Sequence, residues 1–289
     1  MLLLLGASQG ASYLFIRVAV RELSPPALME IRLLFAAPIL VAYCVARGRG
    51  RELLATWRDG LVVGILGAAI PFTLIGWGER HVDSGITGVA NATVPIFVAV
   101  IAMKMLPGER VTGVRLAGVL LGLSGVALLA GLHPQGGPWG VAGTLAVVAA
   151  APSYALATLY AQRRTSVSSL ALAAGSLVWA AVALLPFALV TLPPHVPSAK
   201  TLAAVAVLGV GCTAATHALY YAMVSWHGAS RSVLLTYVTP VFALLLGAWF
   251  LGEQTTLPKL AGLGLIVAGV ALGAGVGMTS RTARPAQGA

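Results

Sequence analysis

The sequence contains very few charged residues. Only 9% of its 289 residues are Asp, Glu, Lys or Arg, whereas a soluble domain carries about 25%. Hydrophobic residues make up 58% of the chain, and the mean hydropathy is +0.93. A surface with so little charge would not be wetted by water. The composition therefore excludes a soluble globular domain and indicates an integral membrane protein.

Acidic residues and cysteines are scarce. The eight carboxylates fall near the ends of apolar runs or in connectors, with Glu30 the deepest, and no two are paired for acid–base chemistry. Cys44 and Cys212 lie inside apolar runs, so a disulfide framework is not expected. No His/Cys/Asp cluster is present either. We expect no catalytic residue, no metal and no cofactor, which disfavours a membrane-embedded enzyme such as a lipid or polyprenyl transferase.

The net charge of +10 comes from basic residues in short gaps between apolar runs, without the basic stripe and interleaved aromatics of a nucleic-acid binder. Basic residues gather on the cytoplasmic side of membrane proteins. An N-terminus inside puts eleven arginines inside and four basic residues outside, so we predict both termini in the cytoplasm. The inner residues are Arg47, Arg49, Arg51, Arg58, Arg110, Arg115, Arg163, Arg164, Arg231, Arg281 and Arg284, and the outer ones are Arg21, Arg80, Lys200 and Lys259.

Ten apolar runs are long enough to cross a bilayer, which takes about 20 residues. The first, "MLLLLGASQGASYLFI", lacks the basic start of a signal peptide, so we interpret it as a membrane span. The predicted spans are 2–21, 25–46, 60–78, 84–106, 112–131, 139–162, 168–191, 201–226, 230–251 and 257–278.

The sequence repeats itself. "LPGERVTGVRLAGVLLGLSGVALLAG" (106–131) aligns with "LGEQTTLPKLAGLGLIVAGVALGAG" (251–275), and Glu109 pairs with Glu253 at a spacing of 144. Because five spans return the chain to the opposite side, the second unit must insert upside down, as in many secondary transporters. We predict an all-α integral membrane fold of ten transmembrane helices in two inverted five-helix repeats, residues 1–134 and 139–279, followed by a cytoplasmic tail, residues 280–289. The Gly-rich fifth and tenth spans are predicted packing or dimerisation helices.

Pro95 and Pro240 lie in the middle of the fourth and ninth spans, in "NATVP" and "TYVTP", 145 residues apart. Proline removes one backbone N–H and crowds the carbonyl four residues back, so we predict a helix break or hinge at each. An unpaired carbonyl is tolerated at membrane depth only where protein or a water-filled cavity satisfies it. Both helices should therefore turn these faces inward.

Polar and aromatic side chains at similar depth are the candidate substrate-binding residues. Side chains three or four apart share a helix face, which groups Gln9 with Tyr13 and Thr213 with His217 and Tyr221. Polar residues in spans also serve as interhelical glue, and Trp77 fits a membrane interface equally well. The candidates are Gln9, Tyr13, Thr73, Trp77, Asn91, Tyr154, Thr213, His217, Tyr221, Thr236 and Thr239.

Charged residues inside spans are functional candidates by default. Arg17 and Arg32 are expected to pair with Glu22 or Glu30 near the outer side. Lys104 can extend to the inner surface. Glu109 and Glu253 each precede a span, where a carboxylate favours the positive helix N-terminus, so we interpret them as structural.

The stretches "GASRSVLLTYVTPVFALLLGAWFLGEQTTLPKLAGLGLIVAGVAL", "LSPPALMEIRLLFAAPIL" and "SGITGVANATVPIFVAVI" resemble EamA-type proteins of the drug/metabolite transporter superfamily over nearly the whole chain. The resemblance implies a ten-helix inverted-repeat carrier in the bacterial inner membrane that exports amino acids, other metabolites or toxic compounds. The chain departs at His217, where an aromatic residue is common, and in "PGER" after the fourth span.

We therefore predict a secondary transporter that exports small metabolites, most of all amino acids or related neutral or zwitterionic compounds, by alternating access. The alternatives are a multidrug efflux carrier and a passive channel. The predicted partners are a small-molecule substrate and the lipid bilayer, with no nucleic acid. Coupling to protons or to a counter-solute, and a monomer or a homodimer, stay open.

Overall fold

The fold is all-helical, as predicted. A computed structural model describes residues 2–105, 113–131, 137–164, 168–219 and 235–273, and every regular element in these ranges is a helix. Six described helices are long and apolar enough to cross a membrane: Pro25–Ala46, Trp57–Gly78, Ser84–Ala102, Pro138–Gln162, Ser169–Val190 and Ala199–Leu219. Four shorter apolar helices are Leu3–Ala19, Leu116–Leu128, Val238–Leu251 and Leu257–Leu272.

The helix bounds lie within a few residues of the predicted spans wherever the structure describes both. The helices are α1 (Leu2–Ala19), α2 (Pro25–Ala46), α3 (Gly50–Ala55), α4 (Trp57–Gly64), η1 (Ile65–Ala69), α5 (Ile70–Gly78), α6 (Ser84–Asn91), α7 (Val94–Met105), α8 (Val114–Gly131), α9 (Pro138–Gln162), α10 (Ser169–Val190), α11 (Ala199–Gly209), η2 (Val210–Ala215), α13 (Leu235–Leu251) and α14 (Leu257–Gly273). The sequence did not predict α3 or the two π-helical segments, η1 and η2.

Local sequence fixes several helix starts. Ser24, Ser168 and Ser198 precede α2, α10 and α11, and each side chain accepts a hydrogen bond from a backbone N–H in the first turn. Pro25 follows Ser24 at the first helical position, where its missing N–H leaves no bond unmade. Gly252, with φ of 66°, turns the chain after α13, in a conformation that a side chain would strain.

The two predicted helix breaks differ. The chain leaves helical geometry after Asn91 and resumes at Val94, directly before Pro95, so the first break is present. Within the break, Thr93 donates its hydroxyl to the Ala90 carbonyl at 2.7 Å. Pro240 lies inside α13, which is helical on both sides of it, so no break occurs at that proline. A helix tolerates proline where neighbouring groups satisfy the freed carbonyl.

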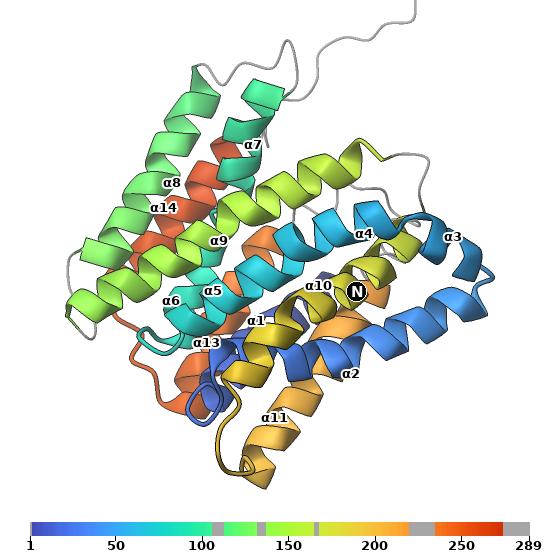
Figure 1. Cartoon of the computed structure of the whole chain (residues 1–289). Helices are drawn as coiled ribbons and strands as arrows, with labels where there is room; N and C mark the ends of the chain where they lie inside the picture. The colour runs from blue at the N-terminus through green and yellow to red at the C-terminus, as the bar shows by residue number, and fades with distance from the viewer. Residues whose placement is uncertain (1, 106–112, 132–136, 165–167, 220–234, 274–289) are drawn as a thin grey trace, which may run out of the picture.

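The helices lie side by side in one bundle (Figure 1). The largest hydrophobic cluster draws on α1, α2, α5, α9, α10, α11 and α13. A second cluster joins α6, α7, α8, α13 and α14. At one edge of the bundle α8 and α14 pack along each other beside α7.

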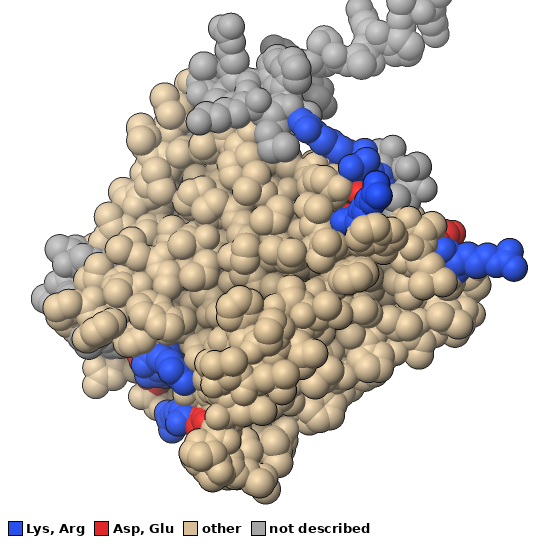
Figure 2. Space-filling model, viewed as in Figure 1, with Lys and Arg blue, Asp and Glu red and all other residues tan. Residues whose placement is uncertain are grey.

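The surface matches a protein embedded in lipid. Charged side chains gather at opposite ends of the visible face, separated by a broad belt without charge (Figure 2). Large apolar residues such as Phe187, Leu245 and Trp249 are exposed, the last to 85%. Water would oppose this exposure, whereas hydrocarbon does not. The belt is therefore the surface that contacts the hydrocarbon core.

The Gly-rich faces of α8 and α14 pack against each other within one chain. A β-carbon at Gly125 would lie 2.9 Å from the Gly262 carbonyl oxygen, and one at Gly269 would lie 2.5 Å from the Gly122 nitrogen. Both neighbours are backbone atoms, so only glycine allows this approach. The prediction that these are packing helices is confirmed for their contact inside one molecule.

Replacing Gly269 with alanine should lower the free energy of unfolding by about 1–3 kcal/mol, because the added methyl group forces the two backbones apart. Thermal unfolding of the purified protein in detergent measures the change. Gly264→Ala on the same helix is the matched control, since no described atom lies within 4 Å of its β-carbon position. Equal melting temperatures for the two variants would contradict this packing.

Candidate functional site

The polar face of α1 meets three other helical segments inside the bundle. Ser8, Gln9 and Tyr13 contact η2, α13 and α6, and Arg32 of α2 contacts η2 beside them. We call this group the central polar cluster. Its members are Ser8, Gln9, Tyr13, Arg32, Asn91, Thr213, Thr216 and Thr239.

Two of its contacts join residues that the sequence named as candidates. The Asn91 Nδ2 atom donates to the Tyr13 hydroxyl at 2.8 Å, and the Thr239 hydroxyl donates to Gln9 Oε1 at 3.2 Å. Tyr13 and Thr239 are buried. Asn91 Oδ1 is buried with no partner among the described residues, which leaves an acceptor free. The broken helix at Asn91 thus presents polar atoms to α1.

Arg32 is the buried cation of the cluster. Its side chain is 6% exposed, its Nε donates to the Thr213 hydroxyl at 2.8 Å, and its guanidinium lies 3.9 Å from the centre of the Phe72 ring. No carboxylate lies within 4.0 Å of it among the described residues. The expected pairing with Glu22 or Glu30 is therefore wrong. Sequence reasoning missed the central position because depth along a helix does not tell which way a side chain points.

The expected partner of Arg17 is also wrong. Arg17 donates to the backbone carbonyl of Glu79 instead of to Glu22 or Glu30. Glu22 accepts from the backbone N–H and the hydroxyl of Ser198 at 2.6 and 2.7 Å. These bonds hold the pKa of Glu22 below its usual value. Glu22, the carboxylate nearest to Arg17 in the sequence, thus has its hydrogen-bond partners at the start of α11.

Of the two π-helical segments, η2 contributes Thr213 to the cluster, and equivalent contacts of η1 and η2 recur 145 residues apart. The segments η1 and η2 begin at residues 65 and 210. Ser153 of α9 donates to the Leu66 carbonyl at 2.7 Å, and Ser8 of α1 donates to the Gly211 carbonyl at 3.3 Å. Serines 145 residues apart thus satisfy carbonyls 145 residues apart. Such π-segments occur frequently at functional sites.

Ser153→Ala should lower the free energy of unfolding by about 1–3 kcal/mol, because it leaves the Leu66 carbonyl without this donor. Ser124→Ala is the control, since the exposed Ser124 hydroxyl bonds only within its own helix, to Leu121. Thermal unfolding in detergent compares the two variants with the parent protein. A loss no larger for Ser153→Ala than for the control would show that a lipid or water group replaces the hydroxyl.

The remaining candidates divide into three groups. His217 Nδ1 lies 2.7 Å from the carbonyl of Thr213, so it adjoins the cluster, and Tyr154 packs against the largest hydrophobic cluster. Thr73 donates to Ala69 of its own helix, and the Trp77 ring lies 4.5 Å from that of His81, so the structure places neither in the cluster. Tyr221 and the side chain of Thr236 lie outside the described residues.

One end of the bundle holds a separate charged group. At this end, called the Arg17 end, α1, α5 and α13 terminate. The Glu253 carboxylate accepts from the backbone N–H groups of Ser84 and Gly85 at 2.8 and 3.0 Å, and Lys259 pairs with Asp83 at 2.7 Å. Glu253 was expected to favour the helix that follows it; it caps the N-terminus of α6 instead. Glu109 lies outside the described residues.

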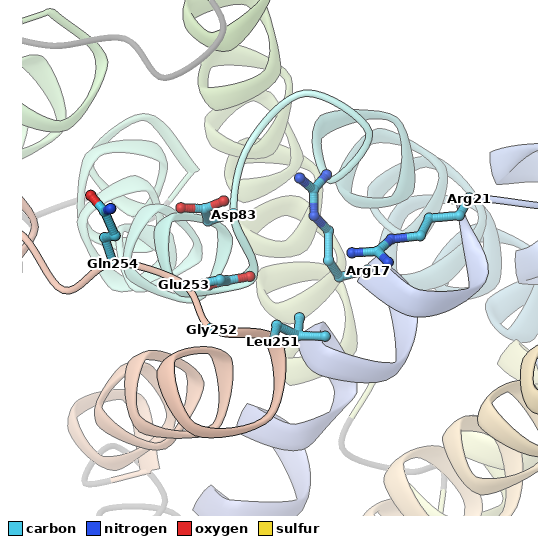
Figure 3. Close-up of a pocket in the computed structure, with 7 residues that line it drawn as sticks. All are labelled: Arg17, Arg21, Asp83, Leu251, Gly252, Glu253 and Gln254. Carbon is cyan, nitrogen blue, oxygen red and sulfur yellow. The ribbon is translucent and has the colours of Figure 1, made fainter.

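A cavity of about 270 Å³ opens at the Arg17 end. In Figure 3, Arg17 of α1 and Arg21, which follows α1, stand on one side, and Asp83, Glu253 and Gln254 stand on the other. None of the predicted substrate-binding residues lines it. We take the central polar cluster as the candidate site, because it gathers polar side chains from five segments, α1, α2, α6, η2 and α13, where lipid provides no partners.

Glu79 is the carboxylate that sequence reasoning missed. Its side chain is completely buried although it follows the end of α5, and Glu30, which was expected to lie deepest within a span, is 4% exposed inside α2. Neither carboxylate oxygen of Glu79 has a hydrogen-bond partner among the described residues. Burial raises the pKa of this carboxyl well above its usual value, against the positive charge of Arg17, which lowers it. The position directly after α5 gave no signal of this burial.

Comparison with known proteins agrees with this architecture. An uncharacterised inner membrane transporter of Escherichia coli, YedA, is 28% identical over 91% of this chain and 86% of its own length. An uncharacterised transporter of Archaeoglobus fulgidus is 25% identical over 90% of this chain and 92% of its own. The Bacillus subtilis transporter YvbV, also uncharacterised, is 28% identical over 86% of this chain and 82% of its own.

A solved crystal structure shares the fold. It covers 94% of this chain and 96% of its own, with a TM-score of 0.67 and 23% sequence identity. The model of the EamA-like transporter family matches residues 1–131 and again residues 141–274. The family model thus matches the chain twice, and the chain has the apolar helices and the internal polar cluster described above. The chain belongs to the EamA-like transporter family.

Proposed function

We propose that this membrane transporter exports small zwitterionic metabolites, above all amino acids, by alternating access around the central polar cluster. Membership of a transporter family supports movement of a small molecule. The cargo class rests on one observation, the buried guanidinium of Arg32 without a carboxylate partner among the described residues.

The cluster matches the chemistry of an amino acid. A guanidinium binds a carboxylate through parallel N–H donors, and such charge-assisted bonds are about twice as strong as neutral ones. Thr213 orients the Arg32 guanidinium through Nε, and Phe72 supports its face. Asn91 Oδ1 is an acceptor for the cargo's ammonium group. A buried charge is costly without a counter-ion, and the cargo carboxylate would supply one.

We further propose ten spans in two inverted repeats, 1–134 and 139–279, with both termini in the cytoplasm of a bacterium and the Arg17 end facing outward. The recurrence of π-segments and serine contacts at 145 residues supports the repeat. So does the double match to the family model. In this scheme the halves rock about the cluster, and the break before Pro95 serves as a hinge in the first half.

A thermal-unfolding screen in detergent tests the cargo. A ligand that binds only the folded state stabilises it by about 2.7 kcal/mol at a hundredfold excess over Kd. We expect L-leucine and L-phenylalanine to raise the melting temperature and nucleosides to leave it unchanged. Unlabelled leucine inside proteoliposomes should also accelerate uptake of labelled leucine, which a passive channel would not show. A shift only with bulky cationic dyes would replace this proposal with multidrug efflux.

A further inference from the structure

Glu79 differs from the other described carboxylates in its surroundings. Each of Glu22, Glu52, Asp59, Asp83 and Glu253 accepts a hydrogen bond or forms an ion pair. In Glu30, Oε2 is the one carboxylate oxygen that is buried without a hydrogen-bond partner in the described part of the chain. Glu79 is completely buried with both oxygens unpartnered there. An isolated ionised carboxylate is too costly to bury, so the group becomes neutral instead.

Charged groups of both the cavity at the Arg17 end and the central polar cluster act on the Glu79 carboxyl. The charged groups that act on it are Arg17 of α1, Glu253 of the segment between α13 and α14, and Arg32 of α2. Arg17 and Glu253 line the cavity, whereas Arg32 belongs to the cluster. A negative charge on Glu79 also acts electrostatically on the Tyr13 hydroxyl in the cluster. A charge on Glu79 is therefore felt at both places.

The groups beside Glu79 in sequence have partners of their own. Arg80 donates to the Leu23 carbonyl at 2.9 Å, and His81 Nδ1 lies 3.0 Å from the Trp77 carbonyl. Arg17 donates to the Glu79 backbone carbonyl and forms no ion pair with the Glu79 carboxylate within 4.0 Å in the described ranges. A cation that paired with the carboxylate would therefore have to be brought to it. An amino acid held by its carboxylate at Arg32 carries such a cation in its ammonium group.

We propose that Glu79 is the exchange site of the transporter, at which a proton and the ammonium group of the cargo compete for one carboxylate. This inference rests on the proposed function. When cargo binds from inside, the O–H bond of Glu79 breaks, its proton goes to the inner solution, and the carboxylate pairs with the ammonium. After the cargo leaves outside, a proton from that side restores the acid, and no other bond changes. One proton then enters for each amino acid that leaves, so the proton gradient drives export.

Infrared spectroscopy tests the resting state of Glu79 without any ligand. The wild-type protein at neutral pH should show the carbonyl stretch of a protonated carboxyl group, and Glu79→Gln should lose that band. Glu52→Gln makes the same chemical change at an exposed carboxylate and should keep it. Glu79→Asp, which retains a carboxyl group, covers the case in which the glutamine variant does not fold. A spectrum in which Glu79→Gln and Glu52→Gln keep the same band would overturn the proposal.

Two probe pairs test the competition. L-leucine and L-phenylalanine should diminish the infrared band, whereas isocaproate and hydrocinnamate, which lack the amino group, should not. In the pH range where the empty protein has Glu79 protonated, the apparent Kd for leucine should fall about tenfold for each unit by which the pH is raised, since one proton is released per ligand bound. Glu79→Gln should remove this pH dependence, and Glu52→Gln should keep it.

The outcomes separate the two proposals. If leucine and phenylalanine cause neither a melting shift nor counterflow, the amino-acid cargo is wrong, and the exchange site falls with it. A second outcome is that both amino acids bind and undergo counterflow, but do not diminish the infrared band of the wild-type protein, and that the Kd for leucine does not depend on pH. In that case the cargo stands and Glu79 is not the exchange site. If isocaproate diminishes the band as leucine does, the ammonium group is not the competitor.

Discussion

Arg32→Gln should abolish amino-acid binding while leaving the empty protein at least as stable as the parent. The guanidinium is buried without a carboxylate within 4.0 Å in the described ranges. Removing one partner of a buried, hydrogen-bonded charge pair costs about 2–5 kcal/mol of binding, a loss of roughly thirtyfold or more. Removing a buried charge that has no counter-ion spares the empty protein its desolvation penalty.

Two measurements on each variant distinguish a binding role for Arg32 from a structural one. Thermal unfolding reports the stability of the empty protein, and leucine counterflow in proteoliposomes reports binding and transport. Arg32→Lys should recover only part of the transport, because an ammonium group lacks the parallel donors of guanidinium. Arg51→Gln, at an exposed arginine, is the control. A strongly destabilised Arg32→Gln, with normal transport by the folded fraction, would make Arg32 a structural residue.

Glu253→Ala should lower the free energy of unfolding by about 2–4 kcal/mol. Its carboxylate accepts from the N–H groups of both Ser84 and Gly85, and Ser84 is completely buried. The residue before α6, Asp83, makes no side-chain cap of its own. Hydrogen bonds to charged groups contribute about 1.5–3 kcal/mol each, and the two overlap in one carboxylate. The link also joins the segment that follows α13 to the start of α6, and these come from different halves of the chain.

Unfolding of Glu253→Ala and Glu253→Gln in detergent measures this link. Glutamine keeps one acceptor oxygen and should recover part of the loss. Glu52→Ala removes an exposed carboxylate whose pair with Arg49 is worth about 1 kcal/mol at most, and it should change little. If Glu253→Ala were no less stable than Glu52→Ala, solvent would be satisfying the start of α6.

The contact of Tyr13 with Asn91 shows what sequence reasoning could predict about the site. Each residue stood out as a polar side chain in the middle of an apolar run, and the structure joins them at 2.8 Å. Thr73 stood out for the same reason, yet its hydroxyl bonds to Ala69 of its own helix. Sequence position gives depth in the membrane, but the direction of a side chain depends on how its helix is rotated against neighbours.

The π-segments and Glu79 were not predictable for a related reason. Both η1 and η2 are apolar stretches whose residues fit an α-helix equally well, and their wide turns rely on Ser153 and Ser8 from other helices. Glu79 follows a helix, where a carboxylate is usually solvated. It is buried nonetheless, at the end of α5 that packs along α9 and beside Arg17 of α1, which donates to its backbone carbonyl.

The sequence by itself determined that this is a helical membrane protein of the EamA kind, and where most of its helices begin and end. Those properties follow from composition, the length of apolar runs and local caps, all of which act between residues close in the chain. Only the tertiary structure decided that Arg32 stands in the centre without a carboxylate and that Glu79 is buried. In a bilayer, polar groups must find partners within the protein, and the packing of helices from both halves determines which groups do.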